Sequence, residues 1–190
     1  MTETKTTRGR LVFLLLAAVF LGPLALAAWM YYAGQLQPEG RTNHGVLLEP
    51  IINLPDTVAD SPLHTTGDGQ WILLYSNDAT CDEGCRNALH TLRQSRLMLG
   101  REMDRLVRVF LHGGTLPDTL FLADEHEGLV TLRDDALQDL LSTTRPADLA
   151  AGGYYLVDPL GNLVLYFGPD INPSAMVEDI KHLLELSRIG

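Results

Sequence analysis

The longest apolar segment of the chain lies near its amino terminus. From Leu11 to Tyr32, about 22 consecutive residues include no charged side chain. A helix of this length, rising about 1.5 Å per residue, can cross the roughly 30 Å hydrocarbon core of a bilayer. Trp29 and Tyr31 stand near its end, where aromatic side chains are typical of the membrane interface. The pattern predicts a single transmembrane anchor.

A cleaved signal peptide is the alternative interpretation of this segment. Ala25 to Ala27 resembles the small-residue site at which signal peptides are cut. The length of the apolar run and the aromatic residues at its end favour retention as an anchor. The sequence leaves both interpretations open.

The charges that flank the segment predict its orientation. Four charged residues precede it, namely Glu3, Lys5, Arg8 and Arg10. Only Glu39 and Arg41 follow closely, so the positive-inside rule keeps residues 1–10 in the cytoplasm. The domain then lies on the other side of the membrane. For a bacterial inner membrane this is the periplasm, where thiols tend to be oxidised.

The polar and apolar pattern after the anchor predicts a linker and then a domain. Residues 33–45 are polar and rich in Gly, Pro and Asn, which is typical of a linker, and the domain covers 46–190. The short apolar runs at 71–76 and 106–111 suit buried strands. Between them, from about 82 to 103, apolar residues recur at three, four and seven, which predicts one helix. This order is a β-α-β unit with parallel strands.

The second half of the domain predicts a loop, a helix, a hairpin and a final helix. Residues 113–128 are interpreted as loop with room for one short strand, and 132–144 as a short helix. The run 154–168 is interpreted as two strands joined by a turn with Pro at its second position and Gly at its fourth. Residues 172–188 form an amphipathic pattern with Pro173 near its start, as helices prefer.

Charge narrows the classes of partner. The formal net charge is −10, and because the first ten residues are net basic, the exported part carries about −12. Phosphate binding needs clustered Lys and Arg, which argues against nucleic acid as a partner. Basic proteins or cations fit this surface better. Simple solubility is the alternative explanation for the excess of acids.

The two cysteines, Cys81 and Cys85, are the candidate chemical site. They lie where the first predicted strand meets the helix, with three residues between them. Positions i and i+4 share one face of a helix, so both sulfurs can point to one spot. Ligands of open α/β sheets gather beyond the carboxyl ends of parallel strands, and a helix amino terminus there stabilises a thiolate.

The element order with a two-cysteine motif at this junction resembles the thioredoxin fold, an α/β class with a central mixed sheet and flanking helices. The C-x-x-x-C spacing, the anchor topology and the ending "YLVDPLGNLVLYFG" plus helix are similar to the Sco/SenC family. That family delivers copper to the Cu_A site of cytochrome c oxidase or reduces its cysteines. The resemblance implies a cytochrome oxidase subunit or an assembly factor as partner, and copper as the metal.

The sequence departs from the Sco/SenC pattern at three positions. The family carries proline after each cysteine, whereas this chain has Asp82 and Arg86. The family's copper-binding histidine aligns close to Ala150, where this chain has no histidine. The family's three-ligand copper site therefore does not carry over unchanged.

Another histidine is a candidate for the missing ligand. His112 follows the second strand directly, so parallel strands place it at the same sheet edge as Cys81. Cys81, Cys85 and His112 are the predicted metal ligands, with His126 as the second choice of histidine. The alternative is a loop histidine that binds no metal.

The thiol pair has three possible roles. Two thiolates are soft ligands that suit Cu(I), and the same pair can cycle between dithiol and disulfide as catalytic residues. A purely structural disulfide is the third reading. Asp82 and Glu83 disfavour a thiolate and Arg86 offsets part of their effect, so a reducing or structural pair is expected rather than a strongly oxidising one.

The favoured hypothesis is a membrane-tethered, Sco-like protein that assists cytochrome c oxidase assembly. Cys81 would be the attacking thiol or first copper ligand, and Cys85 the resolving thiol or second ligand. The alternatives are a non-catalytic interaction module of degenerate thioredoxin fold, and a general periplasmic thiol-disulfide oxidoreductase. The sequence holds no motif for a nucleotide, esterase or metalloprotease site.

Overall fold

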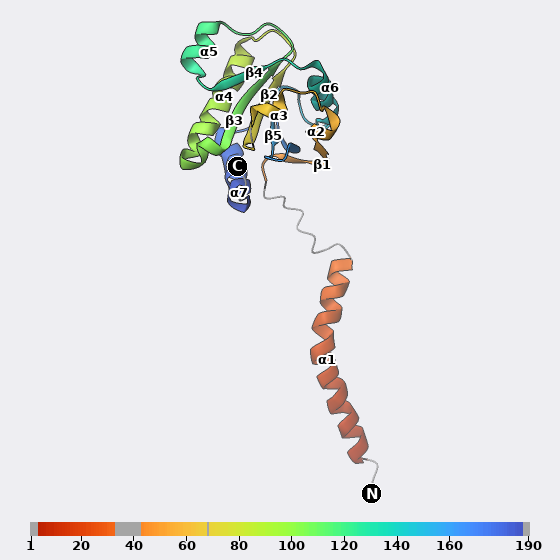
Figure 1. Ribbon diagram of the computed structural model, residues 1–190. Helices are drawn as coiled ribbons and strands as arrows, with labels where there is room; N and C mark the ends of the chain where they lie inside the picture. Colours follow the sequence, from red (N-terminus) through yellow and green to blue (C-terminus); the bar gives the residue numbers. More distant parts are fainter. Residues whose placement is uncertain (1–3, 33–42, 68, 188–190) are drawn as a thin grey trace. The chain divides into compact units, whose positions relative to one another are not determined.

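Short apolar runs pair into one mixed β-sheet (Figure 1). The computed structural model describes residues 4–32, 43–67 and 69–187, and in them the sheet has six strands in the order β1-β6-β5-β2-β3-β4. The strands are β1 (Val46–Asn53), β2 (Trp71–Asn77), β3 (Leu106–His112), β4 (Leu129–Leu132), β5 (Tyr154–Val157) and β6 (Asn162–Phe167). Strands β2, β3 and β4 are parallel, and the other pairings are antiparallel.

Helices cover both faces of the sheet. They are α2 (Leu54–Thr57), α3 (Leu63–Thr66), α4 (Glu83–Met98), the 3-10 helix η1 (Gly100–Arg105), α5 (Thr119–Glu125), α6 (Asp135–Thr144) and α7 (Pro173–Leu186). On one face, α4 and α7 bury their apolar stripes against strand residues such as Leu73 and Phe110. On the other face, α6 buries Leu137 and Leu141 beside α2 and α3. The central strands β2 and β5 are therefore buried on both sides and largely apolar, as is typical of a sheet covered by helices on both faces.

The mixed sheet with flanking helices confirms the predicted α/β class, and β2 and β3 are the predicted parallel pair. The hairpin of β5 and β6 and the final helix α7 are also as predicted. These segments have strong periodicity and clear turn or capping signals, which explains why sequence pattern sufficed.

The single helix predicted from 82 to 103 is wrong in its second half. α4 ends at Met98, and η1 follows. Gly100 has a φ of +61°, a left-handed backbone conformation that breaks the α-helix and that glycine adopts without strain. Leu99 and Met103 fit the helical spacing in the sequence because both pack against the same core as α4, although they lie beyond its end.

The loop predicted at 113–128 is also only partly right. Its second half holds α5, which Asp118 caps by accepting a hydrogen bond from the backbone N–H of Leu120, 3.1 Å away. The strand β4 then follows at 129–132 and pairs with β3 at the sheet edge. Both elements are short, so their periodicity was too brief to detect.

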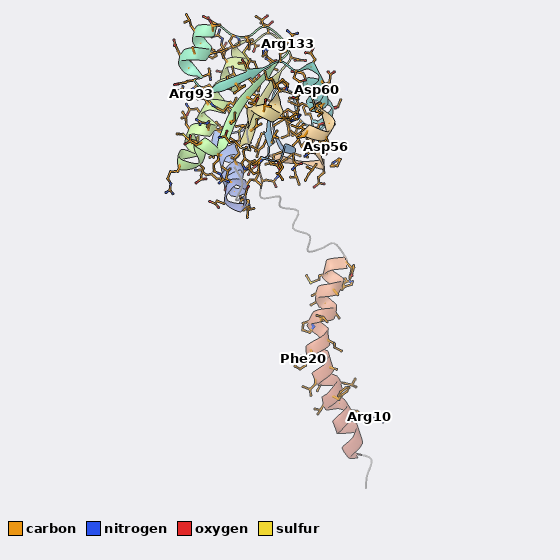
Figure 2. The ribbon with its side chains drawn as sticks, in the orientation of Figure 1. Arg10, Phe20, Asp56, Asp60, Arg93 and Arg133 are labelled. Carbon is orange, nitrogen blue, oxygen red and sulfur yellow. A yellow bond between two sulfur atoms is a disulfide. The ribbon has the colours of Figure 1, made fainter. Side chains whose placement is uncertain are left out.

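The amino-terminal unit contains α1 (Thr4–Tyr32). Its span Gly9–Met30 is 22 residues long and apolar enough to cross a membrane, and none of it is buried by protein. Figure 2 shows Phe20 projecting from it. The chain divides into units 1–42 and 43–190. The limits 1–10, 11–32, 33–45 and 46–190 remain predictions, and residues 33–42 of the predicted linker lie outside the described residues.

Candidate functional site

The two cysteines form a disulfide at the junction of β2 and α4. Cys81 and Cys85 are bonded, with their Cα atoms 5.1 Å apart. Asp82 lies between the strand and the helix as the N-cap of α4, and its Oδ1 accepts a hydrogen bond from the backbone N–H of Cys85 at 3.0 Å. Cys81 therefore precedes the helix, and Cys85 sits in its first turn.

The two sulfur-bearing residues differ in exposure. Cys85 is 2% exposed and lies on the buried face of α4, where it packs in the core with residues such as Leu89. Cys81 is only partly buried. A partner can therefore reach Cys81 more readily than Cys85, which gives the pair an outer and an inner residue.

The loop after β3 packs directly against the loop that carries Cys81. The backbone N–H of Cys81 donates to the carbonyl of Thr115 at 3.3 Å. At Gly114 an added Cβ would lie 2.4 Å from the carbonyl oxygen of Ala79, so only glycine fits this approach. The parallel pairing of β2 and β3 brings these two loops to one sheet edge.

His112 lies at this same edge. It pairs in register with Asn77 at the end of β2, its ring lies 5.8 Å from that of Phe110, and its Nδ1 is 3.1 Å from the carbonyl oxygen of Gly114. In the described part of the chain no hydrogen bond joins His112 to either cysteine, and the three residues are not arranged as a metal-binding cluster. Its role as a metal ligand therefore stays a prediction.

A groove of about 430 Å³ opens beside the disulfide. Its walls come from the end of β2, the start of α4, the loop before β5 and the turn after β6. The residues that line it include Tyr75, Asp82, Cys85, Gly152, Tyr154 and Asp170.

Two tyrosines of this groove have strongly raised pKa values. Burial, and then the negative charge of Asp82, raises the pKa of Tyr75 to about 12. Burial likewise raises the pKa of Tyr154 to about 12, and its hydroxyl donates to the carbonyl of Ala88 at 3.2 Å. Both hydroxyls stay protonated at neutral pH, so neither acts as a base.

The loop before β5 is where the Sco/SenC resemblance placed the family histidine. Ala151 and Gly152 of this loop line the groove, and the carbonyl of Ala150 accepts a hydrogen bond from the Tyr166 hydroxyl. The fold thus places the loop beside the disulfide, but no residue of it can ligate through a side-chain nitrogen.

His126, the second choice of histidine, is buried under α5. It is 2% exposed, and its ring packs edge-on against Phe121 with centroids 4.7 Å apart. Among the described residues, no cluster of three or more His, Cys, Asp or Glu side chains is arranged to hold a metal ion.

Comparison with known families decides the classification of the chain. A family model described as "Transmembrane-like, thioredoxin-like, C-terminal domain" matches residues 71–187. The chain belongs to this family. A second family model, "Transmembrane-like, N-terminal domain", matches residues 4–34. Together with the apolar span of α1, this match supports a membrane anchor. No curated protein matched the chain.

Solved structures of similar fold include Sco proteins. Arabidopsis thaliana ScoI with copper bound has 16% identity and a TM-score of 0.51, over 65% of this chain and 89% of that one. Yeast Sco1 with copper bound has 19% identity and a TM-score of 0.51, over 64% of this chain and 80% of that one. The predicted thioredoxin-like fold is confirmed.

Three groove residues, Tyr75, Tyr154 and Asp170, carry no local sequence pattern that by itself marks them as part of a site. The register explains why they meet: Tyr75 pairs with Tyr154, which in turn pairs with Phe167 at the end of β6. Asp170 follows that strand closely, so the turn after β6 reaches the same sheet edge as Cys81. The only local signal was the position of Asp170 just after the last strand, and the strand order is needed to place that position beside the disulfide.

Proposed function

We propose that this protein exchanges thiols and disulfides with a partner during assembly of cytochrome c oxidase, while its amino-terminal helix holds it at the membrane. The observation that carries the proposal is the disulfide between the partly exposed Cys81 and the buried Cys85, beside an open groove. The Sco-like fold supports the choice of an oxidase subunit or another assembly factor as partner.

The reduced pair would act as a two-electron donor. The Cys81 thiolate attacks one sulfur of a disulfide in the partner, which forms a mixed disulfide and releases the first partner thiolate. The Cys85 thiolate then attacks Cys81 Sγ, releases the second partner thiolate and closes the Cys81–Cys85 disulfide. The partner gains two electrons and, after protonation, two thiols. A dithiol donor in the same compartment must reduce the pair again.

The charges around the sulfurs favour this direction. Asp82 and Glu83 occupy the start of α4, where a thiolate would otherwise gain from the helix dipole. Their carboxylates disfavour the thiolate and thus the reduced state, which gives the pair a low reduction potential. A pair with a low reduction potential donates electrons, so we infer that this protein reduces its partner and not the reverse.

Copper carriage is a second candidate function. The solved Sco structures hold copper, and a reduced Cys81–Cys85 pair would offer two soft sulfur ligands to Cu(I). His112 is the proposed third ligand, because it shares the sheet edge of the pair. Thiol exchange is the better supported candidate, because no third ligand contacts the pair in the described residues.

Exchange is tested with the full chain in detergent, reduced and then mixed with an oxidised Cu_A-bearing oxidase domain. We expect reduced partner thiols to appear as the Cys81–Cys85 disulfide forms. Cys81→Ser should abolish transfer, and Cys85→Ser should trap the mixed disulfide. Thr80→Ser is the control. If cells that carry both cysteine variants still assemble active oxidase, the protein acts as a scaffold without thiol chemistry.

Copper carriage is tested by anaerobic titration of the reduced chain with Cu(I) against a competing chelator. One-to-one binding that both cysteine variants lose would support a carrier, and loss in His112→Ala would identify the third ligand. Absence of competitive binding would exclude the copper candidate and leave exchange as the function.

A further inference from the structure

The groove beside the disulfide is acidic. Asp82 and Asp170 come from different segments, the start of α4 and the turn after β6, and both are exposed at the groove. Neither carboxylate forms an ion pair within the described residues, and the residues that line the groove include no Lys, Arg or His. Two carboxylates without an ion-pair partner in the described residues therefore face one open space.

Tyr75 supplies an unpartnered polar group to the same groove. The residue is only 4% exposed, and its ring packs between Phe110 and Tyr154 with centroids 5.6 and 5.7 Å away. Across the described residues its hydroxyl forms no hydrogen bond, and the hydroxyl oxygen is not among the fully buried unsatisfied atoms, which fits a group that opens onto the groove. A ligand with N–H donors could bind the carboxylates and also donate to this hydroxyl oxygen.

We propose that the groove binds a cationic side chain, Lys or Arg, that flanks the reacting cysteine of the partner. Asp82 and Asp170 would pair with the cation, and Tyr75 would accept a hydrogen bond at the floor. This inference rests on the proposed thiol exchange, and it adds the class of partner: a protein with a basic residue next to its exchanging cysteine.

The groove lies beside the disulfide, so it can select partners by the charge of the residue next to their exchanging cysteine. Asp82 directly follows Cys81, and Cys85 itself lines the groove, so a bound side chain would lie beside the Cys81–Cys85 disulfide. A cation there both attracts the partner and fixes its orientation. A partner with an acid at that position would meet like charges and react slowly.

The test uses three small thiols that differ in charge. The full chain, oxidised and in detergent, is reduced by cysteamine, 2-mercaptoethanol or 2-mercaptoethanesulfonate at equal thiolate concentration. Each thiolate attacks Cys81 Sγ and displaces the Cys85 thiolate, and a second thiolate resolves the mixed disulfide. We expect the cationic thiol to react about tenfold faster than the anionic one at low salt.

Charge-neutral variants locate the effect. Asp170→Asn, distant in sequence from the sulfurs, should lower the cationic preference several-fold, and Asp82→Asn should do the same while keeping a good helix cap. Asp60→Asn is the matched control, because Asp60 is an exposed aspartate between α2 and α3, labelled in Figure 2, that does not line the groove. Its ratio of rates should equal that of the unchanged chain.

Two outcomes would overturn the inference. Equal rates for the three thiols would show that the groove does not select charge, while thiol exchange itself would stand. An equal effect of Asp60→Asn and Asp170→Asn would assign the preference to the net charge of the domain. Resistance of the disulfide to all three thiols would instead refute the proposed exchange.

Discussion

At the scale of single residues, Asp82 has two physical roles. Its side chain caps α4 through the backbone N–H of Cys85, and its negative charge lies beside the disulfide. The cap stabilises the fold, whereas the charge destabilises a thiolate. Substitutions can separate these roles because asparagine caps a helix as well as aspartate does.

We expect Asp82→Asn to raise the reduction potential of the Cys81–Cys85 pair and to leave stability nearly unchanged. Asp82→Ala should raise the potential similarly and also lower the free energy of unfolding by about 1 kcal/mol, because the cap is lost. The potential is measured by equilibration with glutathione, and stability by denaturant unfolding. An unchanged potential in both variants would contradict the electrostatic argument.

At the scale of elements, the loops after β2 and β3 depend on each other. Gly114→Ala places a methyl group against the backbone of Ala79 and should cost about 1–3 kcal/mol of unfolding free energy. It should also speed reduction of the disulfide, because the loop that carries Cys81 loses its support at Thr115.

Gly168→Ala is the matched control for that change, since an added Cβ there meets nothing within 4 Å. Denaturant unfolding and disulfide reduction rates measure both effects. Equal stability of the two variants would show that the contact between the loops is not tight.

The packing of α5 on the sheet makes stability depend on pH. Burial lowers the pKa of His126, and the nearby positive charge of Arg108 lowers it further. In the unfolded chain His126 binds a proton near pH 6.5, whereas in the folded chain it does so only at lower pH. The free energy of unfolding is therefore retained above pH 6.5 and decreases as the pH falls below it.

We expect the free energy of unfolding to fall between pH 6.5 and 5, by up to about 1.4 kcal/mol per pH unit from this one group. His126→Leu should flatten the slope in this range, whereas His182→Gln, an exposed histidine of α7, should not. Denaturant unfolding at several pH values measures the slope. An identical slope for His126→Leu and the unchanged chain would assign the acid sensitivity to other groups.

At the scale of the whole molecule, the proposed function relies on the apolar span of α1 as a membrane anchor. Phe20→Arg puts a charge near the middle of the apolar span, at a cost of about 2.5–3.5 kcal/mol for insertion. The variant should be extracted from bacterial membranes by carbonate more readily than Phe20→Leu.

The mass of the mature chain then decides between anchor and signal peptide, because cleavage would remove α1. Equal extraction of both variants would contradict a spanning helix.

Sequence pattern predicted the elements that have long periodicity or strong turns, namely α4, β2, β3, the β5–β6 hairpin and α7. It did not predict α5 or β4, because four to seven residues carry too little periodicity to outweigh loop composition. It also extended α4 past Gly100, since apolar spacing alone does not reveal a left-handed backbone.

By itself, the sequence determined that the chain carries one apolar span, an acidic α/β domain and a thiol pair at a strand-to-helix junction. These properties are local, because each depends on neighbours within about one element. The tertiary structure alone decided that Cys81 is the outer residue and Cys85 the inner one, and that Tyr75, Tyr154 and Asp170 line a groove together with Cys85. Strand order and register bring these distant segments to one sheet edge, and no local pattern encodes that order.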